Sequence, residues 1–375
     1  MGEPDLKDLP DWVKALGLPP EAVAAIDRYW KPVWEKLSLL PRHHAPGEEL
    51  ELEAIEEERP GPLWQARYEA MWPAYSAWYL KEGDAARPPY RECRDALARY
   101  MPELMPTYER LVELAGGGDL AARLLSLWRP PGFIVGCSQG VWTRGEPMLV
   151  RNYDYPASRL EGIVYLTRWG DRRVIGMSDC LWGLLDGVND AGLTVSLTFG
   201  GRPDVGEGFA ISLVVRYLLE TCDTVDEARA ALERVPVHAP QNLTLLDCSG
   251  AHVTAYVGPD RPVRFVDTPA TTNHQGAVEW PEYARAIRTE ERERCVLDLL
   301  DDEQLTPDRF VDAFLEPPLH NTKYREGFGT IYTAAYHPTG GRVVYRWPDE
   351  EPWELSFDAF APGSRTVALP RSVGS

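Results

Sequence analysis

Residues 136–140 read GCSQG, and residues 150–154 read VRNYD. A short polar turn with a glycine, residues 144–146, lies between the two stretches. Two runs of strand-forming residues joined by such a turn are typical of a β-hairpin, so we predict strands over residues 137–143 and 147–153. The hairpin would bring a thiol from the first stretch close to a guanidinium and a carboxylate from the second.

Cys137 is the first candidate for chemistry. A free cysteine is among the most often buried residue types and usually acts as a small apolar side chain. A reactive cysteine needs nearby positive charge or hydrogen-bond donors that stabilise the thiolate. Arg151 could supply that charge, and Asp154 lies close by in the predicted hairpin. The residues alone leave both interpretations open.

The composition indicates a folded globular protein. The chain has 375 residues, of which 44% are hydrophobic, with 13 Trp and 17 Tyr, and this length allows one large core or a core with an accessory region. It has no apolar run of the roughly 18 residues that a membrane-spanning helix needs, and its first residues lack an export signal, so a cytoplasmic protein is expected. The formal net charge of −19 disfavours nucleic acid and anionic membranes as partners.

Metal binding and disulfide pairing are not indicated. The six cysteines are widely spaced and form no CxxC or Cys/His cluster: they lie at positions 93, 137, 180, 222, 248 and 295. A glutamate-rich run, residues 48–58, is interpreted as a solvated helix face or loop, with metal binding as the alternative. We therefore expect no metal and no cofactor.

The first third of the chain has the pattern of helices. The clearest example is residues 97–115, where apolar residues recur every three or four positions and three glycines, residues 116–118, end the helix. The tract RPPG at residues 129–132 breaks helices strongly. We predict a helical region over residues 1–130, followed by a linker at residues 131–136.

The remainder, residues 137–375, contains groups of strands and groups of helices. Runs rich in β-branched residues predict strands at residues 162–169, 172–178, 193–199, 242–247, 251–257, 262–268, 329–337 and 341–348. Helices are predicted over residues 209–222, from Thr224 with Glu227 in a capping box, over residues 282–300, and from Thr306. Grouped strands and helices, rather than a regular βαβ alternation, indicate an α+β fold.

Three further polar segments could carry chemistry. Residues 186–193, DGVNDAGL, are interpreted as a turn that enters a strand, in which Asn189 is a turn former or a donor aimed into a cleft. His274, in the polar cluster at residues 271–274, is expected to be an ordinary hydrogen-bonded imidazole. The arginines of the helix predicted near residue 290 are expected to be solvated partners of glutamates one turn away: these are Arg288, Arg292 and Arg294.

The motifs become specific when they are taken together. The sequence has no GxSxG, P-loop, GxGxxG or HExxH motif. In order and spacing, however, GCSQG, RNYD, DGVNDAGL, LLETCDTVDEA and TNH resemble the acyltransferase family related to isopenicillin N acyltransferase, a branch of the N-terminal nucleophile (Ntn) hydrolases. The RNxD, DGxNxxGL and TN elements are also similar to those of choloylglycine hydrolases. The resemblance spans about residues 90–340.

The resemblance implies a role for each residue of the hairpin. Cleavage of the peptide bond between Gly136 and Cys137 would make Cys137 an N-terminal nucleophile whose free α-amino group is its general base. Asp154 would orient that amine and balance its charge. Arg151 would hold the thiolate or a substrate oxygen.

Other implied site residues lie later in the chain. Asn189 and Asn273 would be donors near the scissile carbonyl, and Asn273 is the better candidate for the oxyanion site. The family also has a catalytic-site arginine late in the chain, for which Arg325 is the nearest candidate here. His274 is a further, weaker candidate.

The resemblance also implies a fold and an activity. The fold would be a four-layer αββα sandwich over residues 137–375, preceded by a helical pro-segment, residues 1–130, that stays bound or is not released. The activity would be amide-bond chemistry through a Cys137 thioester, on a small-molecule amide or acyl-CoA-like substrate, with transfer to water or to an amine. An unprocessed, non-catalytic binding or scaffold protein is the alternative, and homo-oligomerisation is left open.

Overall fold

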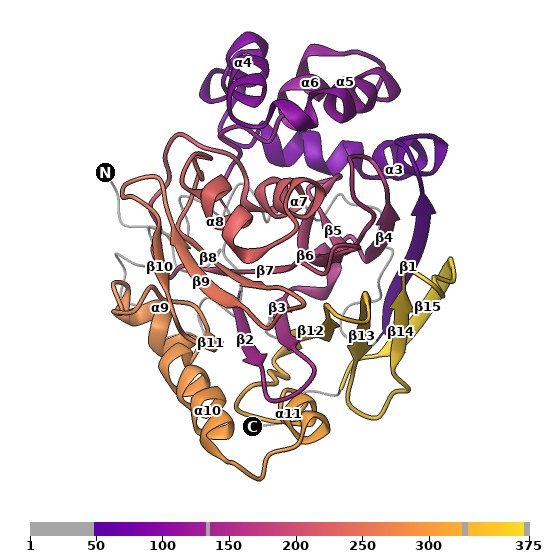
Figure 1. Cartoon of the computed structure of the whole chain (residues 1–375). Helices are drawn as coiled ribbons and strands as arrows, with labels where there is room; N and C mark the ends of the chain where they lie inside the picture. The colour runs from indigo at the N-terminus through magenta and orange to yellow at the C-terminus, as the bar shows by residue number, and fades with distance from the viewer. Residues whose placement is uncertain (1–48, 133–135, 325–328, 371–375) are drawn as a thin grey trace.

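Two β-sheets form the centre of the molecule (Figure 1). The computed structural model describes residues 49–132, 136–324 and 329–370, so the helices predicted within residues 1–48 lie outside the described residues. The larger sheet has nine strands, in the order β10 (Arg264–Val266), β9 (His252–Val257), β8 (Gln241–Leu246), β7 (Thr194–Phe199), β6 (Gly183–Asn189), β5 (Val174–Asp179), β4 (Ile163–Thr167), β1 (Glu49–Glu57) and β15 (Gly363–Ala368).

The smaller sheet carries the predicted hairpin. Its six strands are β11 (Ala270–Thr271), β2 (Gly136–Trp142), β3 (Met148–Tyr155), β12 (Gly329–His337), β13 (Arg342–Arg346) and β14 (Trp353–Ser356), in that order. Strands β2 and β3 pair antiparallel, with Cys137 opposite Tyr153, which confirms the hairpin. The two sheets pack face to face, β2 against β7 and β12 against β6.

Helices cover the outer face of each sheet. On the larger sheet, α7 (Ile211–Thr221) packs on β5, β6 and β7, and α8 (Val225–Leu232) packs on β8 and β9. On the opposite side lie α9 (Pro281–Ala286), α10 (Thr289–Asp301) and α11 (Pro307–Ala313) (Figure 1). An apolar cluster that includes Trp142, Val150, Val296, Phe310 and Phe314 joins the smaller sheet to α10 and α11. The layers therefore follow the order αββα, and the predicted fold class is confirmed.

The glutamate-rich run is a strand, and the prediction of a helix face or loop for residues 48–58 was wrong. Strand β1 pairs parallel with β4 and antiparallel with β15. Its alternating pattern buries Leu50, Leu52 and Ala54 and exposes Glu49 and Glu51. Alternation with a period of two residues is typical of a half-buried strand, and the high glutamate content concealed it.

Between residues 62 and 125 the described part of the N-terminal region is mainly helical, as predicted. Its helices are α3 (Pro62–Tyr79), α4 (Tyr90–Tyr100), α5 (Met105–Leu114) and α6 (Asp119–Leu125). They lie beside the larger sheet in Figure 1, and α3 contacts β1. Because β1 belongs to the central sheet, residues 49–57 share the fold of the strands that follow. The division into a pro-segment and a catalytic domain stays a prediction.

Two predicted helices are broken. Pro102, in a 3-10 turn over Pro102–Leu104, separates α4 from α5 inside the helix predicted over residues 97–115, because proline cannot donate the backbone hydrogen bond that a continuous helix needs. The helix predicted over residues 282–300 is divided at Arg288, which has a left-handed φ of 54°. The cap at Thr224 is confirmed, since Thr224 Oγ1 accepts a hydrogen bond from the backbone of Glu227. The Glu227 carboxylate reaches back to Asp223 N, one residue before the position that a capping box uses.

Candidate active site

The hairpin places Cys137 in the space between the two sheets. Side chains alternate along β2, so Cys137 and Gln139 face the larger sheet, where Gln139 Nε2 lies 2.7 Å from Ser196 Oγ. Ser138 faces the other way, toward α10, and its hydroxyl accepts a hydrogen bond from Arg292. Cys137 is fully buried. The thiol therefore lies inside the molecule at the start of a strand.

Arg151 contacts the thiol. Its Nη2 lies 3.2 Å from Cys137 Sγ, and its Nη1 donates to the carboxylate of Asp186 on β6. Burial raises the pKa of Cys137 to about 11, although the charge of Arg151 opposes the shift. In the intact chain the thiol is therefore protonated at neutral pH. A base is needed to turn it into a nucleophile.

Asp154 lies at the same end of the hairpin on the opposite face of the sheet. Gly136 is its partner across the two strands. The carboxylate accepts a hydrogen bond of 2.7 Å from Thr330 Oγ1, and it lies 3.7 Å from Arg292 Nη1. Burial raises the pKa of Asp154 above its usual value, although the charge of Arg292 and the hydrogen bond from Thr330 oppose this rise. The carboxylate is thus close to the backbone of residues 136 and 137 without facing the thiol.

Asn273 binds the backbone nitrogen of the cysteine. Its Oδ1 accepts a hydrogen bond of 2.9 Å from Cys137 N and another of 2.8 Å from Arg292 Nη2. Its Nδ2 donates to Phe199 O at 3.2 Å. Two donors at Oδ1 and a carbonyl at Nδ2 fix the orientation of the amide. Toward Cys137 the side chain thus acts as an acceptor, and its role as an oxyanion donor stays a prediction.

Asn189 is hydrogen-bonded within the protein at the end of β6. It ends β6, and both hydrogens of its Nδ2 are used, at 2.9 Å to Leu219 O and 2.7 Å to Cys222 O. Its Oδ1 accepts a hydrogen bond from Leu193 N at 2.8 Å. These contacts tie the turn after β6 to the end of α7 and leave no donor for a substrate oxygen. These contacts favour the interpretation of Asn189 as a turn former, and its catalytic role stays a prediction.

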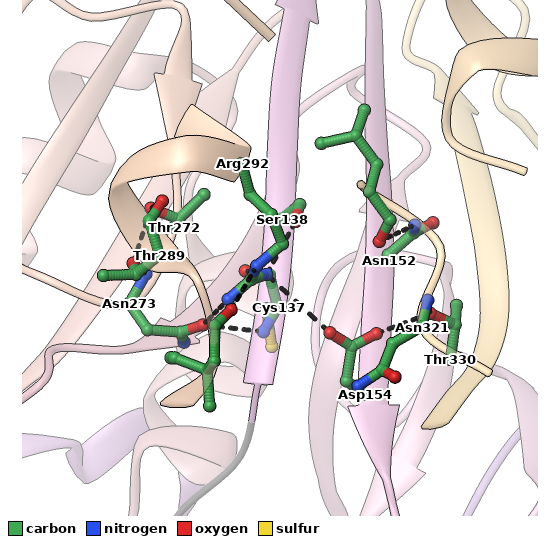
Figure 2. A network of polar contacts seen from close by, with 12 residues as sticks. Cys137, Ser138, Asn152, Asp154, Thr272, Asn273, Thr289, Arg292, Asn321 and Thr330 are labelled. Atoms are coloured by element: carbon green, nitrogen blue, oxygen red, sulfur yellow. Dashed lines mark hydrogen bonds and ion pairs between the residues drawn. The ribbon is translucent and has the colours of Figure 1, made fainter. Parts of the chain in front are cut away.

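Arg292 is a residue of the site that was not predicted from the sequence. This arginine projects from α10 and is buried, and Figure 2 shows its guanidinium between Asn273 and Asp154. It donates to four oxygen atoms: Cys137 O at 2.5 Å, Ser138 Oγ at 2.7 Å, Asn273 Oδ1 at 2.8 Å and Ile287 O at 2.9 Å. The prediction of a solvated partner for glutamates was wrong for this residue. A signal was present, since Arg292 lies on one helix stripe with the buried Thr289 and Val296.

The other predicted residues are less closely connected to the thiol. Arg288 forms an exposed ion pair with Glu291, as predicted. His274 is hydrogen-bonded as expected: its Nδ1 lies 3.1 Å from Thr289 Oγ1 and its Nε2 lies 3.2 Å from Glu293 Oε2. Arg325 lies outside the described residues.

Two negative findings apply to the part of the chain that the structure describes. In this part, no three His, Cys, Asp or Glu side chains are grouped so that they could hold a metal ion. None of the helices in this part combines the length and the apolar character that crossing a bilayer requires.

Several solved structures are similar in fold at low sequence identity. A variant of conjugated bile acid hydrolase from Clostridium perfringens matches with a TM-score of 0.44 and 10% identity, over 64% of this chain and 99% of that one. The Caenorhabditis elegans ortholog of N-acylethanolamine-hydrolyzing acid amidase matches with a TM-score of 0.41 and 16% identity, over 59% and 99%. Penicillin V acylase from Agrobacterium tumefaciens matches with a TM-score of 0.36 and 15% identity, over 63% and 92%.

The sequence itself provides a family assignment. No curated protein sequence matches the chain. The model of the family described as acyl-coenzyme A:6-aminopenicillanic acid acyl-transferase matches residues 142–352. This range covers more than half of the chain and includes Arg151, Asp154, Asn273 and Arg292, and Cys137 lies just before it. The protein therefore belongs to this acyl-transferase family, as the order of its motifs predicted.

Proposed function

We propose that the protein is an amide hydrolase or acyltransferase whose nucleophile is Cys137, made N-terminal by cleavage of the bond between Gly136 and Cys137. Membership of an acyl-transferase family supports the reaction class. One arrangement carries the assignment to Cys137: its sulfur contacts Arg151 Nη2 at 3.2 Å, and its backbone nitrogen contacts Asn273 Oδ1 at 2.9 Å. An ordinary buried cysteine needs neither partner, whereas an N-terminal nucleophile uses both atoms.

The first step is intramolecular. Cys137 Sγ attacks the carbonyl carbon of Gly136, the C–N bond to Cys137 breaks, and the nitrogen takes a proton to become a free amine. Water then hydrolyses the resulting thioester, which leaves a carboxylate on Gly136 and restores the thiol. Arg292, bound to Cys137 O and Ser138 Oγ, holds the strand on the C-terminal side of the cleaved bond in place.

In the second reaction the new amine is the base. It accepts the thiol proton, Sγ attacks the carbonyl carbon of a substrate amide, and the leaving amine departs with that proton. The acyl group remains on Cys137 as a thioester until water or an amine acceptor takes it. Asn273 Oδ1, which accepts from Cys137 N, orients the amine, and Asp154 balances its charge from the same network, 3.7 Å from Arg292 Nη1. Arg151 stabilises negative charge on sulfur or on the substrate oxygen.

The segment before the cleaved bond would stay bound after cleavage. Strand β1 is hydrogen-bonded to a strand on each side in the nine-stranded sheet and buries Leu50, Leu52 and Ala54. Two tryptophans also join this segment to residues after the cut: Trp64 Nε1 donates to Leu181 O at 2.9 Å, and Trp169 Nε1 donates to Glu57 O at 3.0 Å. Removal of this segment would expose apolar surface and leave edges of β4 and β15 unpaired. We therefore infer a non-covalent two-chain product.

Intact-mass measurement tests the proposal. The purified protein should give two masses that correspond to a cut between Gly136 and Cys137, and Cys137→Ala should give one uncut chain without amidase activity. The alternative, an unprocessed scaffold protein, predicts one uncut chain that a thiol alkylator does not modify at Cys137. An active Cys137→Ala variant would place the nucleophile elsewhere. A panel of penicillins, N-acyl amino acids and bile-salt-like amides then defines the substrate.

A further inference from the structure

We propose that Asp186, together with the hydroxyl groups of Tyr332 and Tyr336, is a positioning group that fixes Arg151 so that one edge of its guanidinium faces Cys137. The inference rests on the proposed role of Cys137 as a nucleophile. It gives a function to the aspartate of the DGVN motif, which the sequence reasoning treated as part of a turn.

Asp186 and Arg151 connect the two sheets. Arg151 is on β3 of the smaller sheet and Asp186 is on β6 of the larger sheet, and both side chains are fully buried. Asp186 lies within β6, so the prediction of a turn at this position was wrong. The neighbouring Gly187 explains the close packing there, because a Cβ at that position would lie 2.8 Å from Ile175 O.

The carboxylate of Asp186 is fully engaged. Its Oδ2 accepts hydrogen bonds from Arg151 Nη1 and from Tyr332 OH, the latter at 2.6 Å, and its Oδ1 accepts from Tyr336 OH. The two tyrosines are four residues apart on β12, so both side chains face the same side of that strand. One cation and two hydroxyl donors compensate this carboxylate for the loss of water on burial. Its position is correspondingly rigid.

Arg151 has little freedom as a result. Asp186 holds Nη1, and the rings of Tyr153 and Tyr332 lie 4.9 Å and 5.5 Å from the guanidinium carbon. The other edge of the guanidinium, formed by Nε and Nη2, faces the thiol. Nη2 contacts Sγ, while Nε has no hydrogen-bond partner among the described residues although it is buried. An unpaired buried donor is costly, and here it lies beside the nucleophile.

This geometry suits the oxygen of a reacting carbonyl. When Sγ adds to a carbonyl carbon, the oxygen becomes negative within reach of the Nε and Nη2 edge. Parallel N–H groups on one edge of an arginine bind oxygen atoms with defined geometry. Asp186 therefore acts through Arg151, and loss of its charge should affect reactions that form an oxyanion more than reactions that need only the thiolate.

Two reagents distinguish a reaction that forms an oxyanion from one that needs only the thiolate, and both are used on the processed protein. p-Nitrophenyl acetate acylates a thiolate through an oxyanion, whereas iodoacetamide alkylates it by direct displacement without one. For Asp186→Asn we expect acylation of Cys137 to fall about 100-fold, the usual effect of a lost or misplaced oxyanion donor. Alkylation at pH 7 should instead become faster, because the charge of Arg151 is no longer balanced by Asp186 and the pKa of the thiol falls. The substitution leaves the other charged groups that act on the thiol in place, namely Asp154 on β3 and Arg292 on α10.

Milder variants decide the result if Asp186→Asn does not fold or is not processed. Tyr336→Phe removes a donor to Asp186 without touching Arg151, and acylation should fall about 10-fold while alkylation is retained. Tyr345→Phe is the matched control, since its hydroxyl lies 3.3 Å from Tyr336 OH and makes no hydrogen bond to Asp186 among the described contacts; it should behave like wild type.

Three results would overturn the inference. The first is an equal loss of the acylation and alkylation rates in Asp186→Asn, and the second is an unchanged acylation rate in that variant. The third is the same acylation rate in Tyr336→Phe and Tyr345→Phe. The proposed function is tested separately in the wild type. If neither reagent modifies Cys137 in the wild-type protein, the nucleophile assignment fails, whatever the variants do.

Discussion

Replacement of Arg292 by methionine tests the electrostatic organisation of the site. The guanidinium makes four hydrogen bonds and lies 3.7 Å from Asp154, all in a buried environment. Methionine retains much of the volume, so the main loss is the partner of a buried charge, which costs about 3–5 kcal/mol of unfolding free energy. The measurement is urea unfolding followed by tryptophan fluorescence in the Cys137→Ala background, where a single uncut chain unfolds.

The loss should depend on pH. Burial already raises the pKa of Asp154, and Arg292 opposes that shift, so its removal raises the pKa further. A carboxyl whose pKa is higher in the folded state than in the unfolded state stabilises the fold when protonated, and this contribution is lost as the pH rises through the folded value. Arg292→Met should therefore be more destabilised at pH 8 than at pH 5.

Two comparisons make the test specific. Arg288→Met lies one turn earlier on an exposed face and loses an ion pair with Glu291, so its unfolding free energy should change by no more than about 0.5 kcal/mol. Addition of Asp154→Asn to Arg292→Met should recover part of the loss, because the unpaired charge is removed. A loss in Arg292→Met no larger than that in Arg288→Met, or equal losses at pH 5 and pH 8, would refute the reasoning.

Three further predictions follow from the contacts and pKa shifts. Burial and the neighbouring Glu161 raise the pKa of Asp179 to about 7. The unfolding free energy, measured by urea unfolding, should therefore decrease as the pH rises from 5 to 7.5. Asp179→Asn should make this decrease with pH smaller. Iodoacetamide should modify Cys137 slowly at pH 7 in uncleaved protein and faster toward pH 11, whereas processed protein should react at neutral pH, as peptide mass mapping can show. Asn189→Ala should lower the unfolding free energy by about 1–3 kcal/mol and leave the cleavage rate unchanged, as gel densitometry over time can measure.

Local pattern was sufficient for the hairpin that carries the thiol. The strands predicted over residues 137–143 and 147–153 are confirmed to within one residue, since residues 136–142 pair with residues 148–154, and Gly145 in the turn has a positive φ of 101°. A tight turn and alternating side chains act over a few residues, so the sequence contains the necessary information. The proximity of Cys137 and Arg151 follows from the same register.

Contacts between layers could not be predicted in this way. Strand β1 has a clear period of two, but its parallel neighbour β4 begins more than a hundred residues later. Arg292 binds Cys137 O across a separation of 155 residues, and Asp186 reaches Arg151 only because two sheets stack. Such contacts depend on how layers pack, and single-segment patterns contain little information about that packing. Asp186 of the DGVN motif was therefore assigned to a turn, and Arg292 was assigned to glutamates one helix turn away.

In the proposed mechanism Cys137 supplies both the nucleophile and the base, and the alternation of side chains along the strands separates these two roles. On β2 and β3 the side chains of Cys137 and Arg151 face the larger sheet, where Asp186 is the counter-charge of the arginine. Asp154 and Ser138 face α10, where Arg292 binds both the strand and Asn273. The sulfur and the backbone nitrogen of Cys137 therefore lie in two different polar networks, one on each face of the smaller sheet. Each network can set the protonation of its own atom, which a proton transfer from sulfur to nitrogen requires.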